Sequence, residues 1–496
     1  MHNMKLSIPP VNDLRSALAY LQQVGGQYIE TDHSVDPKAE LAGVYKRIGA
    51  GGTVESPTQI GPAMIFNNII GYPGSRVLVG LMASRQRASI LLGAKKENLS
   101  MHLAKAVKTV IEPILVDADR APCQEEIYYA DDPSFDIRKL LPAPTMTEED
   151  AGPFFCLGLV LGSSLDGKQT DVTIHRLCVQ GRDELSIYFA PNRHIDQFRQ
   201  EAENAGKALP VSINMGLDPA IYIGSCFEAP TTPFGFNELC VAGGLRGKPV
   251  ELVKCVSIPQ RAIARAEIII EGEILPHVRV REDQNTNTGK AMPEFPGYNG
   301  PANPSLPLIK VKAVTMRHHA IMQTVVGVGE MAVLNGLPTE ASIYNAEEDA
   351  LPGFVKNVYA HSAGGGKFLA ILQVCKKLKT DEGRQRQAAL IALATFRELK
   401  NVILVDDDVD PFDTDDVLWA MQTRYQGDVD TIFIPGVTGH PLDPSQSPQF
   451  SPSIRINGTT CKTIFDCTYP FDMKESFKRA KFRDVDPRPF IQEKLS

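Results

Sequence analysis

Three side chains in the middle of the chain have the chemistry of a metal site. Asp171 lies in a run of alternating apolar and polar residues, His194 follows after a turn, and Glu238 lies 44 positions after His194. Two carboxylates and one imidazole suit Mn2+ or Mg2+ better than zinc or copper, and three protein ligands leave positions open for water or a phosphate. Their spacing does not bring them together, so ordinary salt bridging or surface exposure is the commoner outcome for such residues.

Arg176 lies five positions after Asp171 in the same predicted strand. Strict alternation puts the two side chains on opposite faces of a sheet. A ligand that contacts both must pass around the end of the strand or cross a β-bulge. The alternation slips once, at His175, which favours the bulge. An arginine in a strand is usually a surface ion-pair partner, and its functional interpretation is a bidentate clamp on a carboxylate or phosphate.

Glu294 lies in a long segment, 281–306, that is rich in Asn, Thr, Gly and Pro. Segments of that length without regular structure are often functional loops. Because Pro293 and Phe295 flank it, Glu294 has an apolar setting that would raise its pKa and let it carry a proton near neutral pH. A solvated loop carboxylate is an equally good interpretation of the sequence.

Two glycine-rich stretches and one acidic run imitate phosphate or magnesium sites. Residues 49–52 follow a predicted helix instead of a strand, and 363–367 lack the spacing and the Ser or Thr of a phosphate loop, so both are better interpreted as turns. The run Asp406–Asp408 ends a predicted strand, where α/β sheets bind ligands, although turn and capping roles are commoner. A magnesium-dependent phosphoryl-transfer enzyme built on this run is the alternative from another enzyme class.

The composition excludes several classes of protein. A formal charge of 51 − 59 = −8 argues against nucleic acid or an anionic membrane as the main partner. The sequence has no apolar run long enough to span a bilayer, and its first residues lack the apolar core of a signal peptide. Its nine cysteines include no CxxC pair, which indicates reduced thiols in a cytoplasmic protein.

A chain of 496 residues is long enough for two or three domains. Residues 1–121 mix helices and strands, 122–320 are dominated by strand patterns, and 321–496 return to a mixed α/β pattern. The spacing of the middle strands predicts an antiparallel sheet that closes into a barrel or sandwich. In the last part, 382–399 is the longest predicted helix, and the polar stretch after Tyr469 is expected to form an arm over a neighbouring subunit.

Six sequence blocks, in this order, resemble the UbiD-like decarboxylases, which depend on prenylated FMN (prFMN). They are TDVTIHR from Thr170, RHIDQF from Arg193, FNELCVAGGLRG from Phe236, AEIIIEGE from Ala266, EFPGY from Glu294 and LKNVILVDDDVD from Leu399. The stretches AGPFFCLGLVLG, DPAIYIGSCFEAPTTPFG and VREDQNTNTGKAMPEFPGY look most similar to the branch that decarboxylates protocatechuate (3,4-dihydroxybenzoate) to catechol.

The resemblance implies an α+β fold with an N-terminal α/β domain, a central split β-barrel of flavin-reductase type and a C-terminal α/β domain with an oligomerisation arm. It also implies that prFMN is bound in the central domain through Mn2+ (or Mg2+), often with K+. The implied metal ligands are Asp171, His194 and Glu238, although many members have Asn at the first position. The implied cofactor contacts are Ile174, His175, Arg176, Arg193, His194, Glu238 and Lys400.

The same resemblance assigns catalytic roles. Arg176 would orient the substrate carboxylate, Glu294 would donate a proton, and Lys367 and His440 would contact phenolic oxygens. Many members carry a second Glu five residues before the proton donor, where this chain has Gly289, so Glu282 or Asp283 is expected to substitute. Some relatives also carry a histidine shortly after the VGxGE stretch, and this chain has Met331–Val333 there.

The function implied is reversible, non-oxidative decarboxylation of a hydroxybenzoic acid, with protocatechuate giving catechol and CO2, and carboxylation at high bicarbonate in reverse. Decarboxylation of 4-hydroxybenzoate, gallate or a related phenolic acid is the first alternative, and a non-catalytic flavin-binding protein is another. A flavin prenyltransferase would supply the cofactor, and the family suggests a homodimer or homohexamer.

Overall fold

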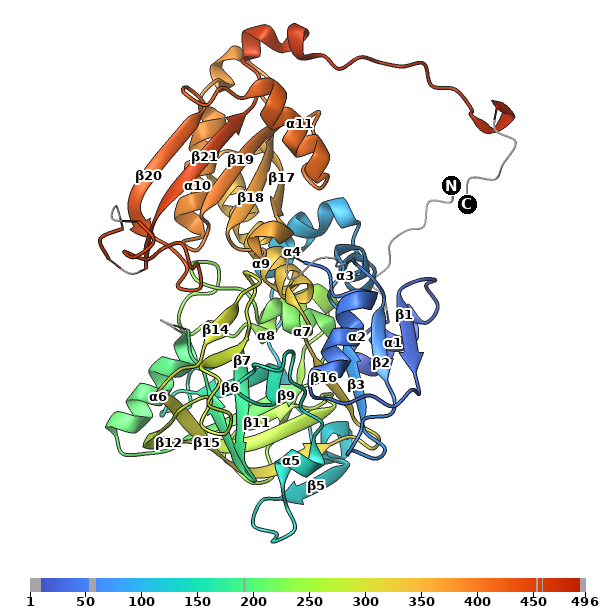
Figure 1. Ribbon diagram of the computed structural model, residues 1–496, viewed down its shortest axis with the longest axis vertical. Helices are drawn as coiled ribbons and strands as arrows, with labels where there is room; N and C mark the ends of the chain where they lie inside the picture. Colours follow the sequence, from blue (N-terminus) through green and yellow to red (C-terminus); the bar gives the residue numbers. More distant parts are fainter. Residues whose placement is uncertain (1–9, 53–58, 191–192, 452–453, 457, 491–496) are drawn as a thin grey trace.

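The computed structural model describes residues 10–52, 59–190, 193–451, 454–456 and 458–490. Figure 1 shows how the three largest sheets are arranged, with the C-terminal one at the top, a barrel at the lower left and the N-terminal one at the right. The N-terminal sheet has the order β1-β2-β3-β16, and its last strand comes from after the barrel. Its elements are α1 (Leu14–Leu21), β1 (Tyr28–Thr31), α2 (Glu40–Ile48), β2 (Ala63–Phe66), β3 (Arg76–Val79), α3 (Arg85–Leu92), α4 (Leu99–Lys108) and β16 (Ile321–Thr324).

Six antiparallel strands form the closed barrel expected in the middle of the chain. Their order is β12-β9-β6-β7-β8-β15, and a further pairing between β12 and β15 closes the ring. Alternate residues of these strands, such as Val160, Leu177 and Ile213, point into one buried apolar cluster. The strands are β6 (Phe154–Ser163), β7 (Thr170–Gly181), β8 (Glu184–Ile187), β9 (Leu209–Met215), β12 (Ile268–Val280) and β15 (Leu306–Met316), with β5 (Glu126–Tyr129) added outside β15.

Short helices and a small sheet cover the barrel. The strand at 251–254 belongs to a separate sheet of order β11-β10-β4, so it lies outside the barrel. These elements are β4 (Ile114–Leu115), α5 (Ile137–Leu140), α6 (His194–Asn204), α7 (Pro219–Gly224), α8 (Leu239–Arg246), β10 (Glu251–Lys254) and β11 (Arg261–Ile263). The long segment 281–306 contains a two-stranded hairpin, β13 (Lys290–Pro293) and β14 (Asn299–Pro301), which Figure 1 shows beside β7 on the side of the C-terminal sheet.

The C-terminal sheet has the order β17-β18-β19-β21-β20. Its longest helix is α9 with 23 residues, whereas the helix expected over 382–399 is α10 with 12 residues, so that expectation was wrong. Pro338 and two glycines, Gly329 and Gly336, disfavour helix in α9, and the burial of α9 on most sides hides any amphipathic period. The elements are α9 (Val328–Ala350), β17 (Val355–Ala360), β18 (Leu369–Val374), α10 (Arg384–Thr395), β19 (Asn401–Asp406), α11 (Thr414–Arg424), β20 (Thr431–Thr438) and β21 (Thr459–Cys467).

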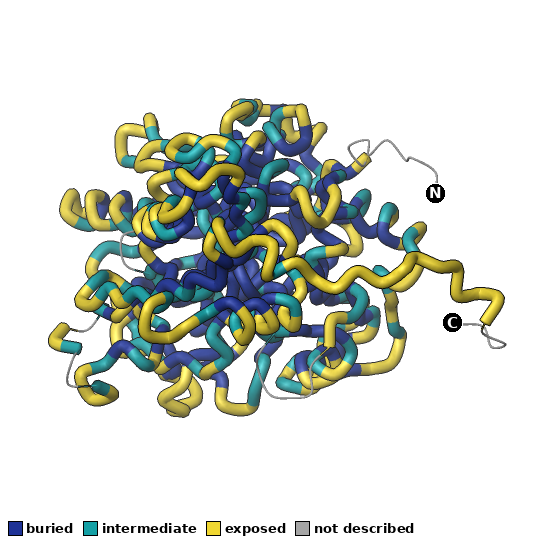
Figure 2. The backbone as a smooth tube through the Cα atoms, turned by 90° about the horizontal axis from the view of Figure 1, so that it is seen from above, coloured by how far each residue is buried: buried dark blue, intermediate teal, exposed yellow. Residues whose placement is uncertain are grey.

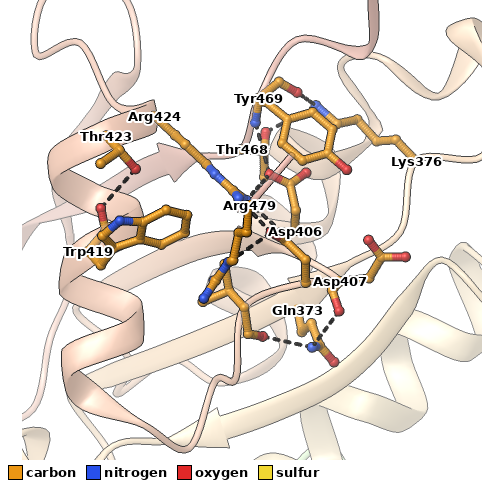
Figure 3. Close-up of polar contacts among 12 residues, drawn as sticks. Gln373, Lys376, Asp406, Asp407, Trp419, Thr423, Arg424, Thr468, Tyr469 and Arg479 are labelled. Atoms are coloured by element: carbon orange, nitrogen blue, oxygen red, sulfur yellow. Dashed lines mark hydrogen bonds and ion pairs between the residues drawn. The ribbon is translucent and has the colours of Figure 1, made fainter. Parts of the chain in front are cut away.

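Two carboxylates of the acidic run at the end of β19, Asp406 and Asp408, form ion pairs with arginines. Arg424, whose side chain is fully buried, contacts Asp406 at 2.9 Å and Asp408 at 2.7 Å, and Arg479 reaches Asp408 at 3.2 Å (Figure 3). Arg479 also lies over the Trp419 ring, 4.0 Å from its centroid. These carboxylates therefore fasten α11 and the C-terminal segment to the sheet edge, and the structure favours this anchoring role over a magnesium site.

Beyond this anchor the chain extends away from the three sheets as an exposed segment, residues 480–490, coloured yellow in Figure 2. Phe482 and Phe490 on it are 89% and 82% exposed. Its contact with a neighbouring subunit and the domain boundaries at 121 and 320 stay predictions. Across the described ranges, no helix combines the length and the apolar composition needed to cross a bilayer.

Candidate active site

The structure brings the three expected metal ligands together. Asp171 lies on β7, His194 is the first residue of α6, and Glu238 immediately precedes α8. One ligand atom from each lies within 4.8 Å of the other two. His194 Nδ1 is 3.0 Å from Asp171 Oδ1, and the Thr173 hydroxyl donates to Asp171 Oδ2 at 3.0 Å.

The electrostatics of this cluster fit a divalent cation. Asp171 and Glu238 are each 3% exposed, and Glu238 Oε2 has no hydrogen-bond partner among the described residues. Burial, followed by the nearby charge of Asp171, raises the pKa of Glu238 well above its ordinary value. A cation would offset both effects, and two carboxylates with one imidazole are ligands that Mn2+ and Mg2+ accept.

Two adjoining cavities lie at and beside the cluster. One, of about 380 Å³, contains the three candidate ligands, and the other, of about 210 Å³, extends to the β13–β14 hairpin and the C-terminal domain. They share Thr173, Arg193 and Glu228 in their walls, so one elongated ligand can occupy both. The second cavity combines apolar walls, among them Met292, Phe295, Val325, Met331 and Leu334, with a few charged groups.

Arg176 is held between two carboxylates in the second cavity. Its Nε and Nη2 donate to Glu282 at 2.9 and 3.0 Å, its Nη1 donates to Glu294, and its guanidinium lies 4.1 Å from the Tyr188 ring centroid. Of the two carboxylates expected to substitute for the missing glutamate, Glu282, at 1% exposure, contacts Arg176, whereas Asp283 pairs with Arg281.

The hairpin between β13 and β14 sets the position and the protonation of Glu294. Glu294 follows β13, and its backbone N–H donates to the carbonyl of Tyr298 across the turn. Its side chain points at Arg176 in the cavity wall. Burial raises the pKa of Glu294, and this effect outweighs the lowering caused by Arg176.

The bulge expected within β7 is not the feature that lets one ligand contact both Asp171 and Arg176. Pairing with β6 is unbroken from Asp171 to His175, and at the irregularity that follows the extra residue lies in β6. The other edge of β7 is paired with β8 only from Leu177 onward, and the described residues place no strand beside it before that point. A ligand lying along this free edge contacts both faces, and four consecutive residues, 173–176, line the cavity there.

Of the remaining residues expected to contact the cofactor, three line the second cavity and one does not. Ile174, His175 and Arg193 line the second cavity, whereas Lys400 lines neither and instead donates to Asp443 and Ser445, both at 2.7 Å. His175 Nδ1 donates to the Tyr188 carbonyl at 3.1 Å, which leaves Nε2 as a buried acceptor without a partner among the described residues. Such an acceptor fits an N–H donor on a ligand, for example the imide of a flavin.

The C-terminal domain contributes the last wall. Lys367 and His440 both line the second cavity, as expected, and Lys367 Nζ pairs with Glu228 at 2.9 Å and Glu398 at 2.5 Å. Burial lowers the pKa of His440 to about 4, so its ring is neutral. Sequence reasoning missed Glu228 and Glu398, because no motif or spacing links them to Lys367, which lies 139 positions after Glu228 and 31 positions before Glu398.

Comparisons with known proteins agree along almost the whole chain. Three family models of 3-octaprenyl-4-hydroxybenzoate carboxy-lyase (UbiD) match this chain. The N-terminal domain model matches residues 21–107, the Rift-related domain model 114–330 and the C-terminal domain model 332–467. A gallate decarboxylase of Lactiplantibacillus plantarum is 53% identical over 476 residues, which cover 95% of this chain and 97% of that protein.

Solved structures agree with these matches. The apo 3,4-dihydroxybenzoic acid decarboxylase (AroY) of Klebsiella pneumoniae is 68% identical, with a TM-score of 0.94 over 98% of this chain and all of the other. An evolved dimeric form of the UbiD-class enzyme HmfF from Pelotomaculum thermopropionicum, in complex with prFMN, is 30% identical, with a TM-score of 0.81 over 98% and 99% of the two chains. This chain belongs to the UbiD family of carboxy-lyases.

Proposed function

We propose that this protein decarboxylates protocatechuate to catechol and CO2, with prFMN held through Mn2+ (or Mg2+) and K+. The observation that carries the proposal is the Glu282–Arg176–Glu294 network. Arg176 and Glu294 line a cavity that shares wall residues with the cavity lined by the three candidate metal ligands. The 68% identity to a 3,4-dihydroxybenzoic acid decarboxylase supports protocatechuate as the substrate.

Asp171, His194 and Glu238 would hold the divalent cation, which neutralises their charge and anchors the phosphate of the cofactor. His175 would accept a hydrogen bond from the ring of the cofactor through its unpaired Nε2. When bound, prFMN supplies an electron sink for the ring carbon that loses CO2, which an aromatic acid cannot provide alone.

The chain's own residues orient the substrate, exclude water and move the proton. Arg176 is fixed by Glu282 and Tyr188 and would orient the substrate carboxylate. Glu294 keeps a proton at higher pH than a solvated glutamate, because burial raises its pKa, and would return it to the ring carbon after CO2 leaves. Lys367 and His440 would hold the ring hydroxyls, and the apolar walls would exclude water.

The reverse reaction, carboxylation of catechol at high bicarbonate, follows from microscopic reversibility. The cofactor would come from a flavin prenyltransferase, and a homodimer or homohexamer would be the working form. Gallate is a second candidate substrate, because a gallate decarboxylase is 53% identical over nearly the whole chain and gallate differs from protocatechuate by one hydroxyl.

The test is a substrate screen on protein produced together with a flavin prenyltransferase and supplied with Mn2+ and K+. We expect CO2 and catechol from protocatechuate at a higher kcat/KM than from gallate, 4-hydroxybenzoate or vanillate. A higher kcat/KM with gallate than with protocatechuate would make gallate the proposed substrate. Protein that binds prFMN and releases no CO2 from any hydroxybenzoate would refute the proposal.

A further inference from the structure

A buried glutamate lies behind the two side chains expected to contact the substrate hydroxyls. Glu398 follows α10, and its Oε2 lies 2.5 Å from Lys367 Nζ and 3.7 Å from His440 Nε2. Lys367 and His440 line the cavity, whereas Glu398 does not. Glu398 therefore acts on a ligand through these two neighbours.

The contacts of His440 fix which ring nitrogen carries its proton. The backbone N–H of Leu442 donates to Nδ1 at 3.0 Å, so Nδ1 has no proton and the neutral ring carries it on Nε2. Phe295 and Phe368 contact the ring edge-on, with centroids 4.8 and 5.8 Å away, and limit its rotation. His440 is thus a hydrogen-bond donor at Nε2 and not a base.

Lys367 is a donor whose direction is set by two carboxylates. Of its three N–H groups, one is directed at Glu228 Oε1, 2.9 Å away, and one at Glu398 Oε2. Although burial lowers its pKa, the charges of Glu228 and Glu398 outweigh this and leave the pKa of Lys367 raised, so the ammonium stays charged. One N–H remains for a ligand in the cavity.

We infer that Glu398 is a positioning residue that turns Lys367 and His440 into a pair of N–H donors for one phenolic oxygen. Glu398 thereby selects aromatic acids that carry a ring hydroxyl at this edge of the cavity. The inference rests on the proposed function, since it assumes a hydroxylated aromatic ligand. Without the negative charge of Glu398, Lys367 keeps only Glu228 as a partner, and the ammonium is no longer held beside His440.

The test separates the hydroxyl edge from the carboxylate edge with two competitive inhibitors of the holoenzyme. Catechol carries the hydroxyls without a carboxylate, and benzoate carries the carboxylate without hydroxyls. For Glu398→Gln we expect the inhibition constant of catechol to rise about 10- to 100-fold, as for the loss of one or two hydrogen bonds to charged groups, while that of benzoate changes less than about twofold. Glu398→Asp, which keeps the charge, should recover part of the affinity for catechol. Glu382→Gln, a partly exposed glutamate of the same domain, should match the wild type.

Nitrogen NMR of histidine-labelled, cofactor-free protein gives a readout that does not need activity. We expect a neutral Nε2–H signal that is missing in His440→Gln and that shifts when catechol is added, and we expect no such shift in Glu398→Gln. Equal effects on catechol and benzoate, or a catechol shift that persists in Glu398→Gln, would overturn the inference. If the wild type decarboxylates no hydroxybenzoate, the proposed function fails, and the NMR titration still decides the role of Glu398.

Discussion

Replacing Asp171 by Asn tests whether the central cluster is built for a cation. Asp171 and Glu238 are both buried, and their ligand atoms lie within 4.8 Å of each other. Two negative charges at that distance repel by about 3.5 kcal/mol at an effective dielectric constant of about 20. Burial and, after it, this repulsion raise the pKa of Glu238, so without a cation the carboxyl keeps a proton to higher pH than an unfolded glutamate does.

Asp171→Asn keeps an oxygen ligand and removes one negative charge. It should therefore raise the stability of the metal-free protein and reduce the stabilisation that Mn2+ gives. Without metal, the variant should be more stable than the wild type by up to about 3.5 kcal/mol near pH 8. The gain should vanish as pH falls toward the unfolded pKa of Glu238, where both states are protonated. Addition of Mn2+ should stabilise the variant by less than it stabilises the wild type. A tenfold weaker Kd lowers the stabilisation by about 1.4 kcal/mol at a fixed excess of metal.

The assay is thermal unfolding of cofactor-free protein at pH 5 and pH 8, with and without Mn2+. Asp166→Asn is the matched control, because Asp166 is an exposed carboxylate in the turn before β7 and should leave the Mn2+ response unchanged. The reasoning is wrong if metal-free Asp171→Asn is no more stable than the wild type at pH 8, or if Mn2+ stabilises both proteins equally.

Two further substitutions test buried glutamates. Glu294→Gln should lower the rates of catechol formation and of deuterium exchange into catechol by about 10²- to 10⁴-fold. In the wild type, activity should fall as pH rises through the raised pKa of Glu294. Unchanged rates in the variant would show that Glu294 is not the acid. Glu347 is fully buried on α9, has no hydrogen-bond partner for either oxygen among the described residues, and has its pKa raised to about 8 by burial. Because it stays protonated at pH 7, where the unfolded chain is ionised, it costs about 3 kcal/mol that Glu347→Gln should recover. This gain should shrink to zero near pH 4.5, while exposed Asp349→Asn changes little; a gain independent of pH would contradict this account.

The central strand was predictable from sequence, because near-alternation of apolar and polar residues is typical of a strand, and the strand spacing predicted a barrel or a sandwich. Burial along the folded strand does not alternate, since Leu177–Gln180 are all buried. The metal cluster was not predictable from spacing. His194 and Glu238 come together because α6 and α8 both begin beside β7, which is a property of the tertiary fold, and only the family resemblance indicated it. The helix α9 was missed because Pro338 and its glycines oppose helical propensity, and packing overrides that propensity.

The position of the cavity explains why one ligand can contact groups with opposite orientations on β7. The unpaired edge of β7 exposes both faces of the strand, so Asp171 and Arg176 line two cavities that share wall residues. The C-terminal domain adds Lys367 to the cavity wall, where the lysine pairs with Glu228 at 2.9 Å. Arg193 contacts the same oxygen of Glu228 at 3.0 Å, so an arginine and a lysine meet on one carboxylate. The dry environment that decarboxylation needs therefore depends on the contact between the two domains.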